Sequence, residues 1–202
     1  MKLIIVRHGQ SEADILQVHE GRADFSLTEK GREQGKLLGK WIAANEDFDV
    51  IISSPLKRAK ETAALISLDT KKKVIFDEAL MEWNNGRLAG LSREEAAKRY
   101  PLPEGGRKPH HSHYDTESMI DFRARGEAFL SKLKEDYGEE ENICIVSHGG
   151  MINMLYRSLL QLPMNTEHSI RLGDTSINKF ILREGKCHIE YINRLQHLDG
   201  LE

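Results

Sequence analysis

The stretch Leu3-Ile4-Ile5-Val6-Arg7-His8-Gly9 decides the fold. Its four successive apolar residues predict a strand that is buried on both faces, as in a parallel sheet covered by helices. Similar apolar runs at 50–52 and 143–146 predict two more buried strands. Helices are predicted between the runs, at residues 28–44, 54–66 and 118–136. This alternation indicates an α/β fold, a three-layer α/β/α sandwich with a mostly parallel central sheet.

The rest of the chain completes this pattern without an internal repeat or an interdomain linker. Shorter elements are predicted as strands at 74–76, 178–183 and 187–192, and as helices at 93–99 and 149–160. The stretch from Pro101 to about Asp115 is rich in proline, glycine and histidine, which predicts a long irregular loop. We therefore expect a single domain over residues 1–202, with a lid-like insertion around 83–117.

The composition is that of a folded globular protein, with 39% hydrophobic and 30% charged residues among 202. The net charge of −3 makes nucleic acid or an anionic membrane an unexpected partner. The N-terminal apolar run is too short for a signal peptide or a membrane span, so we expect a cytoplasmic protein. Cys144 and Cys187 do not indicate a disulfide framework, although one bridge stays open, as does the oligomeric state.

Charged and polar residues follow three of the predicted strands. Arg7 and His8 follow the first, Ser53-Ser54-Pro55 with Arg58 one helical turn later the second, and Ser147-His148-Gly149-Gly150 the third. Sites in such sheets lie off the carboxyl ends of the strands, so these side chains should converge. Two arginines and two histidines beside helix N-termini predict a site for a dianion such as phosphate, although each histidine taken alone is as readily structural.

The motif Arg7-His8-Gly9 after an apolar N-terminal strand resembles the signature of the histidine phosphatase superfamily, which includes the cofactor-dependent phosphoglycerate mutases. Its phosphoglycerate mutase-like, broad-specificity phosphatase branch is the most similar. The resemblance extends over nearly the whole chain in an ordered set of segments. These are Gly21 to Thr28 with Gly31, Ser53 to Ala63, Leu80-Met81-Glu82, Thr116-Glu117-Ser118 with Asp121 and Arg125, Ser147 to Gly150, and Asn193 with His197 and Leu198.

The resemblance implies a metal-independent histidine acid-type phosphatase, without a cofactor, that acts on a small-molecule phosphomonoester. His8 would attack the phosphorus as a neutral imidazole and form a phosphohistidine. Arg7, Arg58 and His148 would bind the nonbridging oxygens. Glu82 would protonate the leaving oxygen and then activate water. Further candidate substrate-binding residues are Gln10, Ser11, Gly149, Arg22 and Arg87.

Three features depart from the family pattern or lie outside it. Asp14 stands where family members often carry asparagine, and we expect it to pair with Arg22 or to point to solvent. Arg87 stands in a segment that has lost an acidic residue and an aromatic ring, and it would bind a second anionic group or be solvated. The third feature is a set of loop histidines, which we expect to be solvated or to touch substrate, with metal binding a minor alternative: His110, His111 and His113.

Two other functions stay open. The first is a phosphoglycerate-type phosphomutase, but the predicted loop is short and holds only the basic pair Arg107-Lys108. The second is a catalytically weak phosphate-binding protein, which the Asp14 and Arg87 departures allow. The sequence does not identify the substrate.

Overall fold

A computed structural model describes residues 1–138 and 140–201, and these residues form one six-stranded sheet. The order across the sheet is β3-β2-β4-β1-β5-β6. The strands from β3 to β1 pair in parallel, whereas β5 and β6 are antiparallel. The predicted mostly parallel sheet is therefore confirmed. The strands are β1 (Lys2–Arg7), β2 (Val50–Ser53), β3 (Val74–Phe76), β4 (Asn142–Ser147), β5 (Ile177–Arg183) and β6 (Lys186–Arg194).

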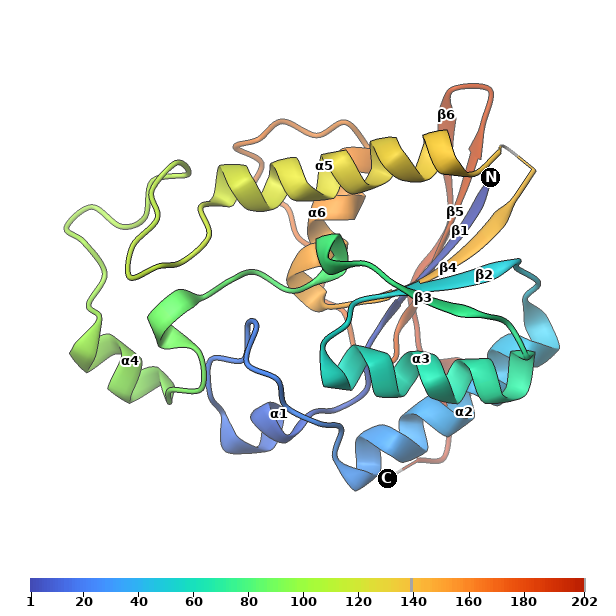
Figure 1. The fold of residues 1–202 in the computed structure, drawn as a ribbon, viewed down its shortest axis with the longest axis horizontal. Coiled ribbons are helices and arrows are strands. Elements are labelled where there is room, and N and C mark those ends of the chain that lie inside the picture. The colour runs from blue at the N-terminus through green and yellow to red at the C-terminus, as the bar shows by residue number, and fades with distance from the viewer. Residues whose placement is uncertain (139, 202) are drawn as a thin grey trace.

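Helices cover both faces of this sheet and make the predicted three layers. Figure 1 shows α5 and α6 on one face and α2 and α3 on the other. No helix of the described part is long and apolar enough to cross a membrane. The α-helices are α1 (Glu12–Leu16), α2 (Glu29–Asn45), α3 (Lys57–Thr70), α4 (Arg93–Arg99), α5 (Met119–Asp136) and α6 (Gly149–Leu159). The short 3-10 turns are η1 (Glu78–Leu80), η2 (Gly86–Leu88) and η3 (Gln196–Leu198).

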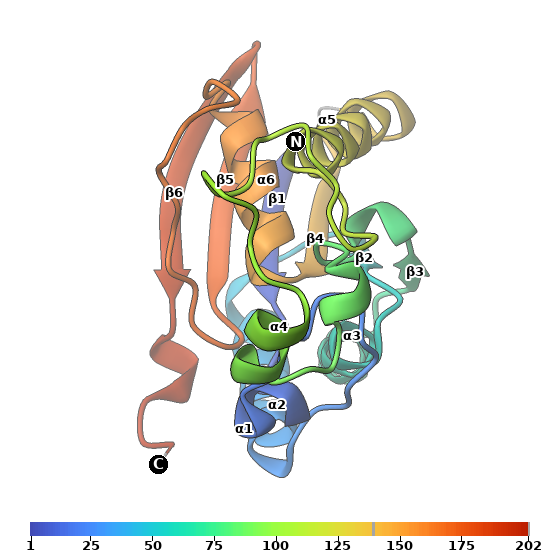
Figure 2. The ribbon, with the colours of Figure 1, turned by 90° about the vertical axis from the view of Figure 1, so that its left-hand side faces the viewer.

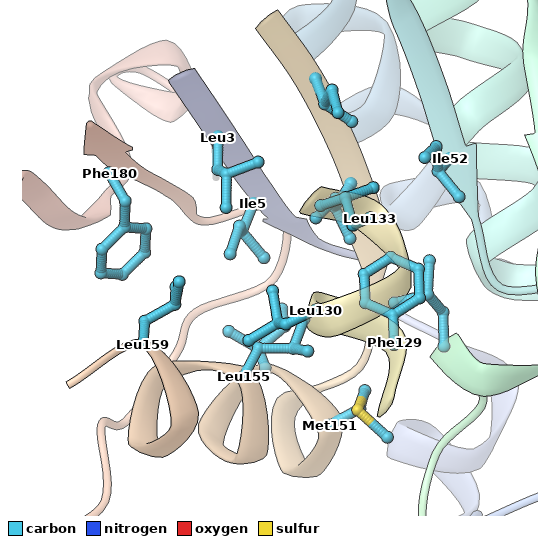
Figure 3. Close-up of a cluster of buried hydrophobic side chains, with 14 of the residues drawn as sticks. Leu3, Ile5, Ile52, Phe129, Leu130, Leu133, Met151, Leu155, Leu159 and Phe180 are labelled. Carbon is cyan, nitrogen blue, oxygen red and sulfur yellow. The ribbon is translucent and has the colours of Figure 1, made fainter. Parts of the chain in front are cut away.

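The central strand β1 is buried on both faces, as its apolar run predicts. Leu3 and Ile5 pack in a cluster with residues of α5 and α6 (Figure 3), and Ile4 and Val6 pack in a second cluster with residues of α2 and α3. Each of these four side chains has no exposed surface. Full burial of such a side chain stabilises the folded state by about 1.5–3 kcal/mol. The two clusters therefore hold the strand, and the residues that follow it, in place.

Three helices begin after the hydroxyl residues that the sequence indicates as N-caps. The side chains of Thr28, Ser92 and Ser118 accept hydrogen bonds from backbone N–H groups of the first turns of α2, α4 and α5. The predicted start of α3 at Ser54-Pro55 is wrong, because this helix begins at Lys57. The N–H of Lys57 donates to the Asp24 carboxylate at 2.7 Å, so a distant loop supplies the partner that Ser54 was expected to provide.

The segment 83–117 lies beyond the carboxyl ends of the parallel strands. It contains η2 and α4, and residues 101–117 form no helix or strand, in agreement with the predicted irregular loop. Figure 2 is turned so that this side faces the viewer and shows α4 in front of the end of the sheet. The segment is therefore placed beside the edge where a site is expected.

Candidate active site

Neighbouring parallel strands bring three of the predicted site segments together. Arg7 at the end of β1 lies opposite Ser147 of β4, and the N–H of His8 donates to the Ser147 carbonyl at 3.0 Å. The N–H of Ser54, after β2, donates to the Val146 carbonyl at 3.0 Å. The carboxyl ends of β1, β2 and β4 therefore present their polar residues at one edge, as predicted.

The His8 ring is held by a hydrogen bond from one nitrogen to the backbone, and its other nitrogen faces Arg58. Its side chain is 2% exposed, and Nδ1 lies 2.7 Å from the carbonyl oxygen of Gly9. Because a carbonyl can only accept, the proton of the neutral ring is on Nδ1 and the lone pair is on Nε2. The Nε of Arg58 donates to Nε2 at 3.3 Å, which agrees with this tautomer. The Nδ1 proton is thus fixed, and the lone pair of Nε2 lies on the side of Arg58.

Burial and nearby cations both favour the neutral form of this histidine. Burial lowers the pKa of His8 well below its ordinary value, and the charges of Arg58 and Arg7 act in the same direction. The hydrogen bond to Gly9 opposes them without reversing the shift. The pKa of His148 is also lowered well below its ordinary value, first by burial and then by Arg58. Both imidazoles are therefore neutral at neutral pH.

Arg58 has no exposed side-chain surface and is held on several sides. Its Nη1 donates to the Ala23 carbonyl at 3.0 Å, and its Nη2 donates to the Gly21 carbonyl at 2.8 Å. The carboxylate of Glu20 lies 3.2 Å from Nε. Burial lowers the pKa of Arg58, while Glu20 and Glu82 oppose that shift. The residues before α2 therefore fix the direction in which this guanidinium points.

Arg7 and His148 each present a buried nitrogen without a hydrogen-bond partner among the described residues. Arg7 is fixed by the Leu172 carbonyl, 2.6 Å from Nη1, and by Asp174, 3.2 Å from Nη2, while its Nε is unpaired. His148 is fixed by the Ser54 hydroxyl, 2.8 Å from Nε2, while its Nδ1 is unpaired. Buried polar groups of native proteins are normally satisfied, so these nitrogens indicate a place for a bound anion.

Glu82 lies at the first turn of α6. Its carboxylate accepts hydrogen bonds from the N–H groups of Trp83 at 2.9 Å, Gly150 at 2.9 Å and Met151 at 3.1 Å. A cavity of about 530 Å³ opens beside it, also lined by Gly150 and Trp83. At Gly149, a Cβ atom would lie 3.9 Å from Nε of Arg7, so this glycine borders the unpaired nitrogen. The predicted acid therefore borders both the cavity and the helix N-terminus.

The remaining predicted substrate-binding residues lie at different distances from the cluster of four side chains described above: Arg7, His8, Arg58 and His148. The Gln10 side chain accepts from the Thr28 hydroxyl at 2.8 Å, which ties it to the start of α2. The buried Ser11 hydroxyl donates to Asp14 at 3.0 Å. Arg22 Nε donates to the Glu82 carbonyl at 3.4 Å, so it borders the site. Arg87 does not join the cluster, because its side chain is 61% exposed and is paired with Asp115 at 2.7 Å.

The expected pairing of Asp14 with Arg22 is wrong. Asp14 accepts from the N–H of Ser11 at 2.8 Å and so caps α1, and its carboxylate reaches Arg7 only at 4.0 Å. Arg22 lies 3.9 Å from Glu117 instead. The expectation that Asp14 points to solvent is closer to the structure, since 36% of its side chain is exposed.

Two partly buried carboxylates of the site were missed from the sequence. Glu20 lies beside Arg58 and His8, and Asp174 fixes Arg7. Burial raises the pKa of both carboxyl groups. Nothing next to either residue signals this role, because their partners are distant in the chain. The loop histidines contact one another edge to face, and the described residues hold no group of three or more His, Cys, Asp or Glu side chains that could bind a metal ion.

Known proteins similar to this chain include several phosphatases, and a probable phosphoglycerate mutase of Erwinia tasmaniensis is similar as well. Phosphoserine phosphatase 1 of Hydrogenobacter thermophilus is 29% identical over 98% of this chain and 94% of its own length. A broad-specificity phosphatase of Saccharomyces cerevisiae is 27% identical over 99% of this chain and 89% of its own length. These relatives support the predicted phosphomonoesterase and make the mutase alternative the weaker one.

Solved structures agree with this comparison. A variant of phosphoserine phosphatase from Entamoeba histolytica, in complex with phosphoserine, superposes with a TM-score of 0.80 at 31% identity, covering 98% of each chain. The alpha-ribazole phosphatase from Shigella flexneri has the same fold, with a TM-score of 0.88 at 24% identity over 96% of this chain and 97% of its own. The model of the histidine phosphatase superfamily, branch 1, matches residues 3–195. The chain therefore belongs to the histidine phosphatase superfamily, as its first strand and the motif that follows it indicate.

Proposed function

We propose that this phosphatase hydrolyses phosphomonoesters in two steps, with Nε2 of His8 as the nucleophile. The observation that carries the proposal is the position of the His8 ring, whose proton is held on Nδ1 by the Gly9 carbonyl. Its lone pair on Nε2 therefore faces the space bordered by Arg58 and by the unpaired nitrogens of Arg7 and His148. A phosphoryl group in that space would satisfy the unpaired donors and present its phosphorus to Nε2.

In the first step, Nε2 forms a bond to phosphorus while the bond to the leaving oxygen breaks. The protonated carboxyl group of Glu82 gives its proton to that oxygen. In the second step, water attacks the phosphohistidine, Glu82 takes a proton from the water, and the bond between nitrogen and phosphorus breaks. Arg7, Arg58 and His148 bind the nonbridging oxygens in both steps. The enzyme returns to its starting state and phosphate leaves.

This mechanism does not require a metal ion, because two guanidinium groups supply the positive charge. Arg7 and Arg58 both lie close enough to the nucleophile for their charges to lower its pKa. Phosphoryl transfer is promoted mainly by positioning and by stabilisation of charge on the equatorial oxygens. We therefore expect full activity in the presence of a strong chelator.

We also propose that the substrate carries a second anionic group. His19 and Arg93 line the cavity beside Glu82, and the guanidinium of Arg107 stacks 4.9 Å from the centre of the Trp83 ring. Burial lowers the pKa of His19, and Arg93 and Arg107 lower it further, so their charges lie close to the cavity. The Nε of Arg107 is buried without a partner among the described residues. This arrangement suits a carboxylate, as in phosphoserine, and it gives Arg107 and Arg93 the role expected of Arg87.

The segment 83–117 is the proposed lid over this site. Trp83, at its start, and Arg93, in α4, line the cavity, and Arg107 of the irregular loop stacks on the Trp83 ring. Closure of such a segment would bring its cations toward the substrate and exclude water during the first step. The chain would then act as one domain with a mobile cover.

Phosphate release from a panel of phosphomonoesters, measured with EDTA present, tests the reaction. We expect H8A to release none and E82Q to be slower by about 100-fold or more. The exposed residues His188 and Glu78 supply the controls H188A and E78Q, which should match the wild type. Rapid acid-free quenching should trap phosphohistidine in the wild type and not in H8A. Release by H8A at the wild-type rate would rule out this nucleophile.

Phosphoserine and phosphoethanolamine differ only by a carboxylate, so they test the second subsite. We expect R107A to raise the KM for phosphoserine by about tenfold and to leave the KM for phosphoethanolamine nearly unchanged. K108A alters the adjacent, exposed cation and serves as the control. Equal changes for both substrates in R107A would contradict the carboxylate subsite.

A further inference from the structure

Glu20 places a carboxylate where the phosphoryl group has to bind. Its Oε1 lies 3.2 Å from Nε of Arg58, and its Oε2 lies 4.0 Å from Nε2 of His8. Only 17% of its side chain is exposed. The next residue, Gly21, accepts a hydrogen bond from Nη2 of the same arginine, so this stretch of backbone wraps around Arg58. The carboxylate therefore lies beside both the nucleophile and Arg58, one of its two cations.

This position conflicts with phosphoryl transfer. A reacting phosphorus lies about 3–3.5 Å from the attacking nitrogen, with its oxygens around it. The Oε2 atom of Glu20 lies only 4.0 Å from Nε2, close to where these atoms would be. Its Oε1 atom pairs with Arg58, whose charge would otherwise meet a phosphate oxygen. A carboxylate and a phosphate dianion also repel one another at this distance. The two groups cannot occupy the space together.

The charges around Glu20 come from three elements. Arg58 on α3 and Arg7 at the end of β1 favour the ionised carboxylate, as does the hydroxyl of Ser11 before α1. Asp14 on α1 acts in the opposite direction, and burial is the largest influence, so the pKa of Glu20 is raised. The neighbouring His8 is neutral because its own pKa is lowered. The Oε1 atom has no hydrogen bond of good geometry among the described residues, so the ion pair with Arg58 is its main attachment.

We propose that Glu20 is an internal anion of the phosphoryl subsite, which leaves Arg58 when the phosphoryl group of the substrate binds and returns when phosphate departs. The inference rests on the proposed function, because it takes His8 and Arg58 as the phosphoryl subsite. The cavity beside Glu82 is lined by Glu20 as well, so it offers room for the displaced side chain. The same carboxylate would then compete with the product phosphate for Arg58 and hasten its release.

The competition depends on pH in a defined direction. Above its raised pKa, Glu20 is ionised, and phosphate must displace a charged ligand from Arg58. Below that pKa, the carboxyl group is neutral and its hold on Arg58 is weak. The penalty on phosphate binding is therefore largest at high pH and disappears as the pH falls. Other groups that titrate, including phosphate itself, affect the wild type and a Glu20 variant alike.

The inhibition constant of inorganic phosphate tests this proposal. We expect E20Q and E20A to bind phosphate about tenfold more tightly than the wild type at about pH 8, and the ratio to be smaller at about pH 5. E20A is included because the glutamine amide of E20Q can donate a new hydrogen bond to phosphate, whereas alanine cannot. E12Q, at an exposed carboxylate of α1, should match the wild type at both pH values. Equal or weaker binding by both Glu20 variants at high pH would overturn the proposal.

A crystal structure of the wild type with phosphate gives a second test that needs no variant. We expect Glu20 to have moved away from Arg58, and a carboxylate still paired with Arg58 beside bound phosphate would overturn the proposal. A failure of the Glu20 proposal can be distinguished from a failure of the proposed function. If H8A abolishes turnover while wild type and E20Q bind phosphate equally, only the role of Glu20 is wrong. If no form binds phosphate, both proposals fall.

Discussion

The guanidinium of Arg125 forms two parallel hydrogen bonds with the carboxylate of Glu117, from Nε at 2.9 Å and from Nη2 at 2.8 Å. The same group donates to the backbone carbonyls of Ala79, Met81 and Glu82 at 2.8, 2.7 and 3.2 Å. Arg125 therefore ties the start of α5 to the turn that carries the proposed acid. Lysine cannot reproduce this planar set of donors.

We expect R125K to act through the position of Glu82. Its kcat/KM for an alkyl phosphate, which reports the first step, should fall by about tenfold or more, because the leaving alkoxide needs a proton from Glu82. Its kcat/KM for p-nitrophenyl phosphate should change little, since that leaving group needs no proton. Steady-state kinetics with both substrates makes the comparison. R123K, on the same helix but bonded to Glu127 and Leu162, is the control. Equal loss on both substrates would point to general distortion.

The second prediction concerns stability at acid pH. Burial lowers the pKa of His8, His148 and His197, the last to about 4. Each ring stays neutral in the folded state but gains a proton in the unfolded chain below about pH 6.5. The contribution of each neutral histidine to the unfolding free energy is therefore fully present above about pH 6.5. It is lost as the pH falls toward the lowered pKa of that histidine in the folded protein. Each histidine contributes a slope of up to about 1.4 kcal/mol per pH unit.

H197Q removes one of these contributions outside the proposed catalytic residues. His197 Nε2 lies 2.8 Å from the Thr175 hydroxyl, a contact that glutamine can retain in part. We expect the unfolding free energy of H197Q to fall less steeply than that of the wild type between about pH 6.5 and pH 4. Urea unfolding at several pH values measures the slopes, with the exposed His188 supplying the control H188Q. Parallel curves for wild type and H197Q would contradict the prediction.

Local signals in the sequence predicted most of the fold. The apolar runs identified the buried strands, and the hydroxyl residues Thr28 and Ser92 marked helix starts, because strand burial and capping act over a few residues. Helix α1 (Glu12–Leu16) was missed, since five residues are too few to show helical periodicity. The start of α3 was misplaced because the Ser54 hydroxyl bonds His148, and Asp24 from a distant loop accepts from the N–H of Lys57.

The residues of the proposed site that follow a strand end could be predicted from the sequence. His8, Arg7 and His148 could be found because parallel strands bring their carboxyl ends to one edge. Glu20 and Asp174 could not, because their roles come from contacts with Arg58 and Arg7 that only the folded chain creates.

The hydroxyl of Ser54 gives a third prediction. It lies 2.8 Å from Nε2 of His148 and fixes the ring so that Nδ1 is left for the phosphoryl group. S54A leaves a buried nitrogen unpaired, which should cost about 1–3 kcal/mol of unfolding free energy. We expect kcat/KM to fall by about tenfold as the ring loses its orientation. S67A is the control. It removes a hydroxyl on α3 that donates to the carbonyl of Lys72, so it should destabilise the fold without lowering kcat/KM.

The last prediction compares the two carboxylates near Arg7. Asp174 lies 3.2 Å from Nη2 of Arg7 with 22% of its side chain exposed, whereas Asp14 lies at 4.0 Å with 36% exposed. Asp14 is also occupied by the N–H and hydroxyl of Ser11, and asparagine retains an oxygen for the N–H. We therefore expect D14N to change KM by about twofold at most.

D174N should have the larger effect, because it removes the charge that holds Arg7 in place. We expect its KM to rise by about tenfold, while D14N stays near the wild type under the same conditions. Initial rates over a range of substrate concentrations decide between them. A tenfold fall of KM in D14N would show instead that Asp14 repels the phosphoryl group, and that its hydrogen bonds to Ser11 do not turn its charge away from the site.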